Sequence, residues 1–180
     1  AATVLADDPL LNVRWPAAEP YPLAQLRQPL RLIIDSQSRL QRGGRLLDEP
    51  APIWLLRPAG AVRAGWLRAQ DQQLACTTTA SGQLDLPALL LQLGALAINE
   101  LWVEAGPGLA GALIQAELAD RLLLYLAPRL LGSGSRGLFV LPGLEKLAVS
   151  PHLRLIDQRM VGDDLRLIAE LDRASRQEQG

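Results

Sequence analysis

The sequence has little of the chemistry on which metal enzymes and many hydrolases depend. Its 180 residues include one cysteine, Cys76, and one histidine, His152. A single cysteine excludes an intramolecular disulfide and a Cys-x-x-Cys metal knuckle. With one imidazole, a zinc site would need carboxylates for most of its ligands, and a Ser-His-Asp triad would depend on His152 without a G-x-S-x-G turn. We therefore expect neither a metal hydrolase nor a triad hydrolase.

The chain also lacks a strong net charge and a long hydrophobic run. It has 18 Lys and Arg against 19 Asp and Glu, and the basic residues are scattered, so we expect no nucleic-acid or membrane partner. The longest apolar stretch, 86–98, is shorter than the roughly 20 residues of a membrane span and predicts a buried helix. The first residues do not form a secretory signal, and we expect a cytoplasmic protein.

What is present fits a globular enzyme-sized domain. The chain is 49% hydrophobic and 21% charged, which is typical of a folded soluble domain rather than a disordered segment. Its length suggests one domain with a real core. We place that domain at residues 1–171 and interpret the polar residues 172–180 as a tail.

The hydrophobic pattern predicts strands that alternate with helices. Strands are expected at 30–35, 53–56, 101–104 and 121–127, with a weak strand near 74–77, and a final pair at 153–161 and 165–171 around a Gly/Asp turn. Helices are expected at the start as far as Asp7, at 86–97 and at 109–118, and the proline-rich segment 16–29 is expected to be a loop. This order predicts an α/β fold with three layers, a mostly parallel sheet and an antiparallel C-terminal hairpin.

The strongest local signal is LWVEAGPGLAGAL, residues 101–113. We interpret it as a buried strand ending at Glu104, a glycine-rich turn and the start of a helix. Glycines allow a ligand to approach the backbone, and the free N–H groups of a helix N-terminus favour phosphate. The alternative is a tight strand-to-helix turn with Glu104 in solvent.

Ser36 follows the strand at 30–35, with Arg39 and Arg42 nearby. A hydroxyl and two guanidinium groups at the carboxyl end of a strand suit a phosphomonoester such as the 2′-phosphate of NADP. The residues alone favour the other interpretation, an ordinary Asp-Ser turn with solvated arginines.

Two further segments also have two interpretations. Asp7 and Asp8, with Arg14 beyond them, either place a carboxylate and a guanidinium in one pocket or simply end a helix. The glycine/serine run 132–137 is either a phosphate-binding nest or a plain turn, and the plain turn is favoured.

Four segments together resemble one family. They are VLADDPLLNVRW (4–15), PLRLIIDSQSRL (29–40), LWVEAGPGLAGALIQAELADRLLLYLAPRLLGS (101–133) and GLFVLPGLEKL (137–147). The chain is similar, over residues 1–171, to the reductase half of the bacterial bifunctional riboflavin-biosynthesis deaminase/reductase, which has a dihydrofolate-reductase-like fold. The segments are specific as a set because they occur in the family's order.

The resemblance implies a reduction of 5-amino-6-(5-phosphoribosylamino)uracil to the ribitylamino compound, with NADPH as cofactor and a homodimer as the expected assembly. The family's substrate positions match Leu11, Arg14 and Glu104. Its cofactor positions match Thr3, Asp7, Ser36, Gly106, Pro107, Gly108, Leu109, Ala110, Gly111 and Ala112.

The same resemblance suggests a role for each polar group. Arg14 would pair with the 5-phosphate of the substrate, a contact suited to a guanidinium. Glu104 would hold the substrate and, as the catalytic residue, assist ring opening by proton transfer before hydride reaches C1′. Ser36 would meet the 2′-phosphate of the cofactor.

The sequence also departs from the family. A zinc deaminase needs His, Glu and two cysteines in a fixed pattern, which one His and one Cys cannot supply, so this chain cannot deaminate. Family reductase domains begin with a further strand and helix, preceded in the bifunctional proteins by the deaminase domain, and the activity of this polypeptide alone stays open. Two alternatives remain: another dihydrofolate-reductase-like pterin or pyrimidine reductase, and a non-catalytic, dimerising scaffold.

Overall fold

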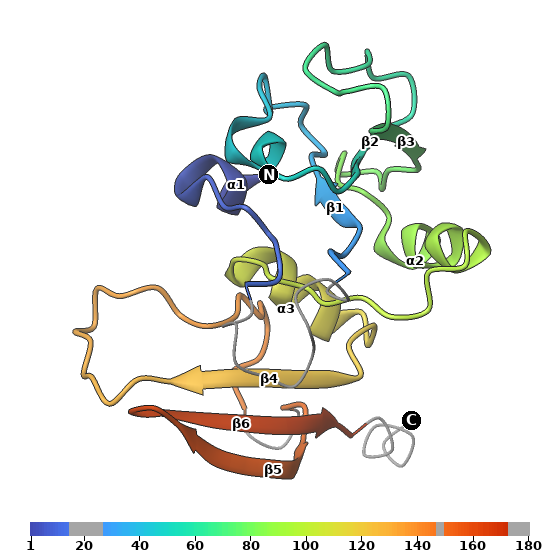
Figure 1. The fold of residues 1–180 in the computed structure, drawn as a ribbon. Coiled ribbons are helices and arrows are strands. Elements are labelled where there is room, and N and C mark those ends of the chain that lie inside the picture. The colour runs from blue at the N-terminus through green and yellow to red at the C-terminus, as the bar shows by residue number, and fades with distance from the viewer. Residues whose placement is uncertain (15–26, 147–149, 173–180) are drawn as a thin grey trace. The chain divides into compact units, whose positions relative to one another are not determined.

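A computed structural model describes residues 1–14, 27–146 and 150–172, and the chain forms two compact units, 1–101 and 102–180. The first unit contains α1 (Ala2–Asp7), β1 (Arg31–Ile34), the 3₁₀ helix η2 (Gly44–Asp48), β2 (Ile53–Pro58), β3 (Gln72–Cys76) and α2 (Leu86–Ala95) (Figure 1). The second contains α3 (Pro107–Gln115), β4 (Arg121–Leu126), β5 (Leu153–Val161) and β6 (Asp164–Leu171). The fold is therefore mixed α/β.

The sheet of the first unit is parallel, with strand order β1-β2-β3. Its central strand β2 is the most apolar, and Ile53, Leu55 and Leu56 are all almost completely buried. A strand with neighbours on both sides and packing on both faces needs such a continuous apolar run. The predicted strands at 30–35, 53–56 and 74–77 are confirmed, with ends shifted by one or two residues.

Two hydrophobic clusters cover the two faces of this sheet, because successive side chains of a strand point to opposite sides. Ile33, Ile53 and Leu55 pack with Leu46 of η2, and Val4 of α1 joins the same cluster. The other cluster combines strand residues with the turn before α2 and with α2 itself, and contains Leu56, Cys76, Leu84, Leu89 and Leu93.

Helix α2 begins where the sequence predicts. The side chain of Asp85 accepts a hydrogen bond from the backbone N–H of Ala88 and caps the first turn. The helix buries Leu89 and Leu93, whereas Leu91 is 77% exposed. The prediction of a buried helix therefore holds for one side of it only.

A short hairpin connects β3 to α2. Thr78 and Leu84 form an isolated antiparallel bridge. The N–H of Thr79 donates to Gln83 O and that of Gly82 to Thr79 O. The connection is thus closed by its own backbone hydrogen bonds.

The sheet of the second unit is antiparallel, with order β4-β6-β5. The predicted strand 121–127 and the predicted hairpin are confirmed. Val161 pairs with Asp164, and Gly162 begins the two-residue turn with φ 61°, a conformation that favours glycine. A register shift between Leu155 and Asp157 marks a bulge in β5.

The predicted strand at 101–104 is wrong. These residues form no strand, and Trp102 and Val103 are 75% and 52% exposed. Their residue types favour a strand, but a strand is stable only when its backbone pairs with a neighbour, and in the described structure none pairs with this segment. Glu104 therefore does not end a buried strand.

Other predictions fall partly outside the described structure. The predicted loop 16–29 is described only from residue 27, and residues 173–180 of the predicted tail lie beyond the described ranges. Helix α3 begins two residues before the predicted start, because Pro107 occupies its first turn. Among the described helices, none is long and apolar enough to cross a membrane.

Candidate functional site

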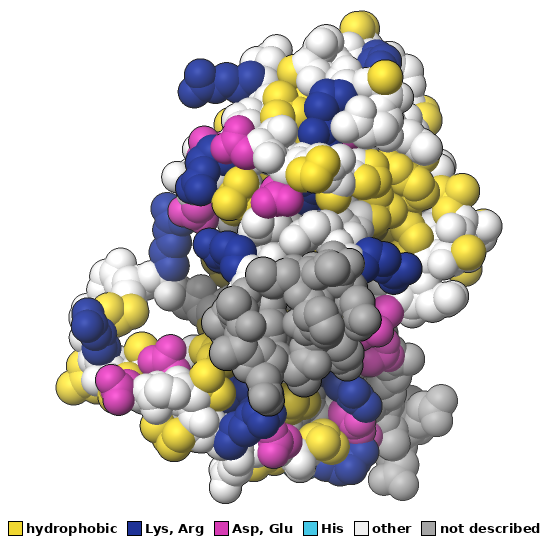
Figure 2. Space-filling model, viewed as in Figure 1, with side chains coloured by type: hydrophobic (Ala, Val, Ile, Leu, Met, Phe, Trp, Pro, Cys, Tyr) yellow, Lys and Arg dark blue, Asp and Glu magenta, His cyan; other side chains and the backbone are white. Residues whose placement is uncertain are grey.

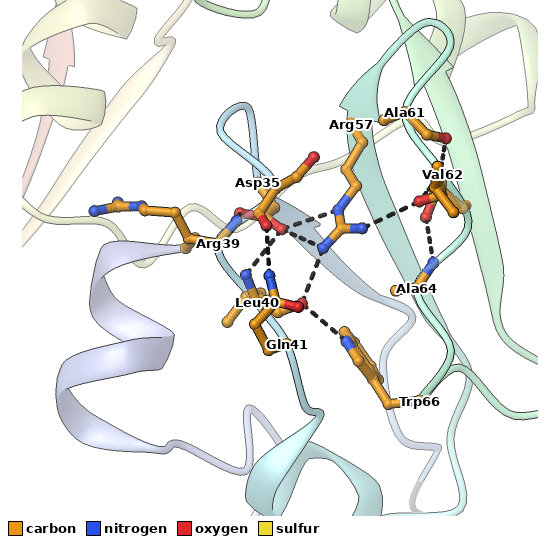
Figure 3. A network of polar contacts seen from close by, with 12 residues as sticks. Asp35, Arg39, Leu40, Gln41, Arg57, Ala61, Val62, Ala64 and Trp66 are labelled. Atoms are coloured by element: carbon orange, nitrogen blue, oxygen red, sulfur yellow. Dashed lines mark hydrogen bonds and ion pairs between the residues drawn. The ribbon is translucent and has the colours of Figure 1, made fainter.

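A buried ion pair lies at the carboxyl end of the parallel sheet (Figure 3). The register pairs Ile34 with Leu56, so the next residues, Asp35 and Arg57, lie beside each other. Arg57 Nη2 is 2.8 Å from Asp35 Oδ2, and the two side chains are 6% and 0% exposed. The carboxyl edge of a parallel sheet is where such folds bind ligands, and here the sheet places a fixed polar centre at that edge.

A pocket of about 350 Å³ opens next to this ion pair. One wall is the loop after β1, with Ser38, Leu40 and Gln41. The other follows β2 and includes Arg63 and the indole of Trp66. The remaining lining residues are Arg57, Val62, Ala64 and Gly65.

The pocket walls are held by hydrogen bonds. Trp66 Nε1 donates to Leu40 O at 3.1 Å and joins the two loops. The side chain of Gln73 accepts from the N–H of Ala64 at 3.0 Å and donates to Ala61 O at 3.0 Å. These bonds fix the backbone of both walls and the position of the Trp66 indole.

Ser36 lies in the turn directly after β1 and is half-buried. Arg39 and Arg42 are exposed, and Figure 3 shows the side chain of Arg39 extending away from Arg57 and Trp66. The structure thus brings Ser36 to the edge of the sheet but does not gather the two arginines around the ion pair. Ser38, two residues on, lines the pocket with φ 51°, which is rare for a non-glycine residue.

The N-terminal candidates lie on and after α1. Thr3 is half-buried within the helix, and Asp7, its last residue, is exposed. Asp8 adopts φ 42° and its Oδ1 accepts the backbone N–H of Arg45 at 2.9 Å. Asp8 therefore holds η2 and ends α1, which supports the helix-end interpretation for this residue.

Leu11 and Arg14 follow in an irregular segment. Leu11 is half-buried with φ 50°, and Arg14 is exposed. Leu10 O accepts a bond from the buried Arg31 at 3.2 Å, and Asn12 Nδ2 donates to Glu49 at 2.6 Å. A leucine in this backbone conformation stays there only when its surroundings hold it, and such residues are common at binding sites.

In the second unit, the remaining candidates form one continuous stretch. Glu104 is exposed and lies two residues before Gly106, the N-cap of helix α3, which begins at Pro107. No side chain caps α3, in contrast to Asp85 at α2. Pro107 has no N–H, so Gly108 and Leu109 carry the first N–H groups of the helix, and neither donates to another described residue outside the helix.

The glycines of this turn divide into two kinds. A Cβ at Gly106 or Gly108 would meet nothing within 4 Å, whereas a Cβ at Gly111 would overlap the carbonyl oxygen of Val140. Gly111 is thus required by packing. Gly106 and Gly108 leave open space beside free N–H groups, and this arrangement fits a phosphate of a nucleotide cofactor.

A second ion pair, between the half-buried Arg68 and the buried Asp71, lies at the opposite, amino end of the parallel sheet. Arg68 Nε is 2.9 Å from Asp71 Oδ2, and Asp71 Oδ1 accepts the N–H of Ile53 at 2.9 Å. Burial raises the pKa of Asp71, but the hydrogen bonds from Arg68 and from backbone N–H groups outweigh it, and the pKa lies below its ordinary value. The bond to Asp71 raises the pKa of Arg68.

Two further features of the described residues are the grouping of potential metal ligands and the distribution of surface charge. Within the described ranges, no cluster of His, Cys, Asp and Glu could hold a metal ion. On the face shown in Figure 2, Lys and Arg side chains are dispersed among acidic and hydrophobic ones rather than gathered into a basic surface.

Sequence reasoning missed the Asp35–Arg57 pair and the pocket beside it. The signal was present, because a charged residue directly after the apolar run 53–56 is unusual unless it has a partner at the same depth. Asp35 and Arg57 are 22 residues apart, however, and only the strand register shows that they meet.

Comparisons with known protein families and sequences identify relatives of this chain. The family model described as "RibD C-terminal domain" matches residues 1–167. The chain is 46% identical over 170 residues to the riboflavin biosynthesis protein RibD of Escherichia coli, covering 92% of this chain and 46% of that protein. It is 33% identical over 175 residues to the 5-amino-6-(5-phosphoribosylamino)uracil reductase of Buchnera aphidicola, covering 93% of this chain and 82% of that protein.

A solved structure agrees with the sequence matches. RibD of Acinetobacter baumannii superposes with a TM-score of 0.79 at 28% identity, over 95% of this chain and 45% of that one. The chain thus spans about half the length of the RibD proteins that it matches. The resemblance inferred from the four segments is confirmed, and the chain belongs to the RibD C-terminal domain family.

Proposed function

We propose that this chain is a reductase that converts 5-amino-6-(5-phosphoribosylamino)uracil to 5-amino-6-(5-phosphoribitylamino)uracil in riboflavin biosynthesis, with NADPH as the reductant. Its family and its match to a reductase of that name over 82% of the relative's length support the proposal. The observation that carries it is the open, uncapped start of α3, where Gly106 and Gly108 leave room beside free N–H groups.

Each group of residues would hold one part of the cofactor. Gly106 and the N-terminal part of α3 as far as Ala112 would bind the diphosphate through backbone N–H groups and the positive end of the helix. Ser36, at the carboxyl edge of β1, would donate to the 2′-phosphate, and Thr3 and Asp7 would complete the binding. When bound, NADPH supplies the hydride that reduces C1′ of the substrate.

The substrate would be held by three residues. Arg14 is exposed and is free to form two charge-assisted hydrogen bonds with the 5-phosphate. The fixed backbone at Leu11 would support the substrate's apolar surface. Glu104, in the stretch before α3, would hold the sugar and donate a proton to its ring oxygen as the ring opens. Positioning of these groups would supply most of the rate acceleration.

The finer predictions on fold and assembly belong to the same proposal. They are a three-layer, mostly parallel, dihydrofolate-reductase-like sheet, a homodimer, a cytoplasmic location, and a zinc deaminase domain elsewhere in the full-length protein. The two hydrophobic clusters that cover both faces of the β1-β2-β3 sheet support the three-layer arrangement. The exposed apolar residues of β5, such as Leu155 and Met160, support a surface that pairs with a second copy.

The test is a substrate panel with the full-length protein. The loss of NADPH absorbance would be followed with the phosphoribosylamino-uracil, with its counterpart that has not been deaminated, and with dihydrofolate. Turnover of the uracil compound above the other two supports the proposal. Preference for another substrate favours a different pterin or pyrimidine reductase, and no binding at millimolar NADPH favours a non-catalytic scaffold.

A further inference from the structure

The Asp35–Arg57 ion pair connects two loops that form opposite walls of one pocket (Figure 3). Both side chains lie at the carboxyl edge of the parallel sheet, and Asp35 and Arg57 are 1% and 5% exposed. A charge pair at this depth has no access to solvent ions. The role of the ion pair must therefore follow from the groups that the two side chains contact.

The carboxylate of Asp35 fixes the loop after β1. Its Oδ1 accepts the backbone N–H of Arg39 at 2.9 Å, and its Oδ2 accepts that of Leu40 at 3.2 Å. The N–H of Ser38 donates to the carbonyl oxygen of Asp35 at 3.0 Å. One residue thus sets the backbone of the whole turn that begins at Ser36.

The guanidinium of Arg57 connects the loop after β1 to the loop after β2. It donates to Asp35 Oδ2 from Nε at 3.0 Å and from Nη2 at 2.8 Å. Nη2 also donates to Leu40 O at 2.9 Å, and Nη1 to Val62 O at 3.3 Å. A planar group with donors on three nitrogens can do this, whereas the single ammonium of a lysine cannot reach all three partners.

Burying such a pair does not by itself stabilise a fold. The loss of hydration of two charges often equals or exceeds their attraction, and apolar pairs of the same size are frequently as stable. The gain from this pair is geometric, because it holds Ser38, Leu40 and Val62 of the pocket in one arrangement. A preformed pocket binds its ligand with less loss of conformational freedom.

We infer that Asp35 and Arg57 are positioning residues for cofactor binding: together they hold the two loops that receive the adenosine end of NADPH. The inference rests on the proposed function, in which Ser36 meets the 2′-phosphate. The pair does not touch the reacting atoms. Its loss therefore weakens NADPH binding and raises the KM for NADPH, while kcat is retained.

The chain offers a matched control at the other end of the same sheet. Arg68 is paired with the buried Asp71 and donates to Glu49 O at 2.8 Å and Ala51 O at 2.9 Å. Arg68→Lys removes a comparable set of bonds at the amino edge, where none of the partners of the Arg68 guanidinium lines the pocket. A general loss of stability would affect NADPH binding equally in Arg57→Lys and Arg68→Lys.

The experiment compares these two variants with the wild type in the full-length protein. The dissociation constant of NADPH, kcat, the KM for NADPH and the melting temperature are measured for each. We expect Arg57→Lys to weaken NADPH binding by about tenfold, with kcat within about twofold, and Arg68→Lys to leave binding within about twofold. Faster amide hydrogen exchange at Arg39 and Leu40 in Arg57→Lys alone reports the loosened loop.

A second variant covers the case in which Arg57→Lys does not fold. Asp35→Asn combined with Arg57→Gln removes both charges together, so that none is left buried without a partner, and the same loss of NADPH affinity is expected. If Arg57→Lys and Arg68→Lys weaken NADPH binding equally, or if NADPH binding is unchanged when the Asp35–Arg57 pair is removed, the inference is overturned. Either result leaves the proposed function standing. A wild-type protein that binds no NADPH overturns the proposed function, and the inference with it.

Discussion

The backbone carbonyl of Val140 lies directly against Gly111, and the N–H of Val140 donates to Pro107 O at 3.0 Å. The N-terminal half of α3 is therefore fastened to the segment around Val140 by a hydrogen bond at Pro107 and by a contact at Gly111 that leaves no room for a side chain. Gly111→Ala places a Cβ against a backbone that cannot yield, and we expect a loss of about 2 kcal/mol in the free energy of unfolding. Chemical denaturation of the variant measures it.

Gly108→Ala is the matched comparison on the same helix. Its Cβ would meet nothing within 4 Å, and alanine favours a helix over glycine by up to about 1 kcal/mol. We expect unchanged or slightly higher stability together with weaker NADPH binding, because the methyl group enters the space proposed for the diphosphate. Unchanged NADPH affinity in this variant would place the diphosphate elsewhere.

Glu104 is proposed to donate the proton for ring opening. Glu104→Gln keeps the size of the side chain and removes the acid, so turnover should fall about 100-fold while NADPH binding and melting temperature stay the same. Glu100→Gln, an exposed glutamate of the neighbouring segment, serves as the control. Equal turnover in the two variants would remove Glu104 from the chemistry.

Arg14 is proposed to bind the substrate phosphate. Because its exposed side chain contributes little to the fold, Arg14→Gln should raise the KM for the substrate by about tenfold or more without changing the KM for NADPH. Steady-state kinetics with each substrate varied in turn separate the two constants. The same change at the exposed Arg27 is expected to alter neither.

Asp71 makes the free energy of unfolding depend on pH in the acidic range. Its pKa is lowered in the folded state, so the unfolded chain binds the proton more readily. The stabilisation is complete above the ordinary pKa of about 4 and is lost as the pH falls from there towards the lowered value. Denaturation at a series of pH values should show this loss, and Asp71→Asn should reduce it while costing about 3 kcal/mol at neutral pH. Asp48→Asn, at an exposed position, is the control.

Cys76 should be inert at neutral pH. It is 2% exposed, and burial raises the pKa of its thiol. We expect alkylation of the native protein to be slower than that of the unfolded chain by at least about 100-fold. Because the folded state keeps the proton, stability should decline as the pH rises above the unfolded value of about 8.5. Rapid native labelling would contradict the buried position.

Much of the fold could be predicted from local pattern. Apolar and β-branched runs located β1 and β2, and Asp85 with Pro87 located the start of α2, because these signals act within a few residues. The segment 101–104 has the same residue types, but whether it forms a strand depends on a partner strand that local pattern does not specify. The prediction of a strand at 101–104 failed because no described strand pairs with this segment, although its residue types favour a strand.

The candidate site was predictable only in parts. The glycine turn after Glu104 can be recognised in the sequence because its residues are contiguous. The pocket walls cannot, because Asp35 and Arg57 meet through the register of two strands and Trp66 reaches Leu40 across a loop. Neither contact has a fixed spacing that a pattern could reveal.

The hairpin between β3 and α2 offers a practical use. It lies at the same edge of the sheet as the pocket, since β2 and β3 run parallel, yet its own backbone bonds close it and Ser81 at its tip is exposed. A fluorophore attached there, through Ser81→Cys with Cys76 shielded inside, would report binding of the proposed nucleotide cofactor without changing a residue that lines the pocket. Occupancy could then be followed optically in a protein that is not turning over.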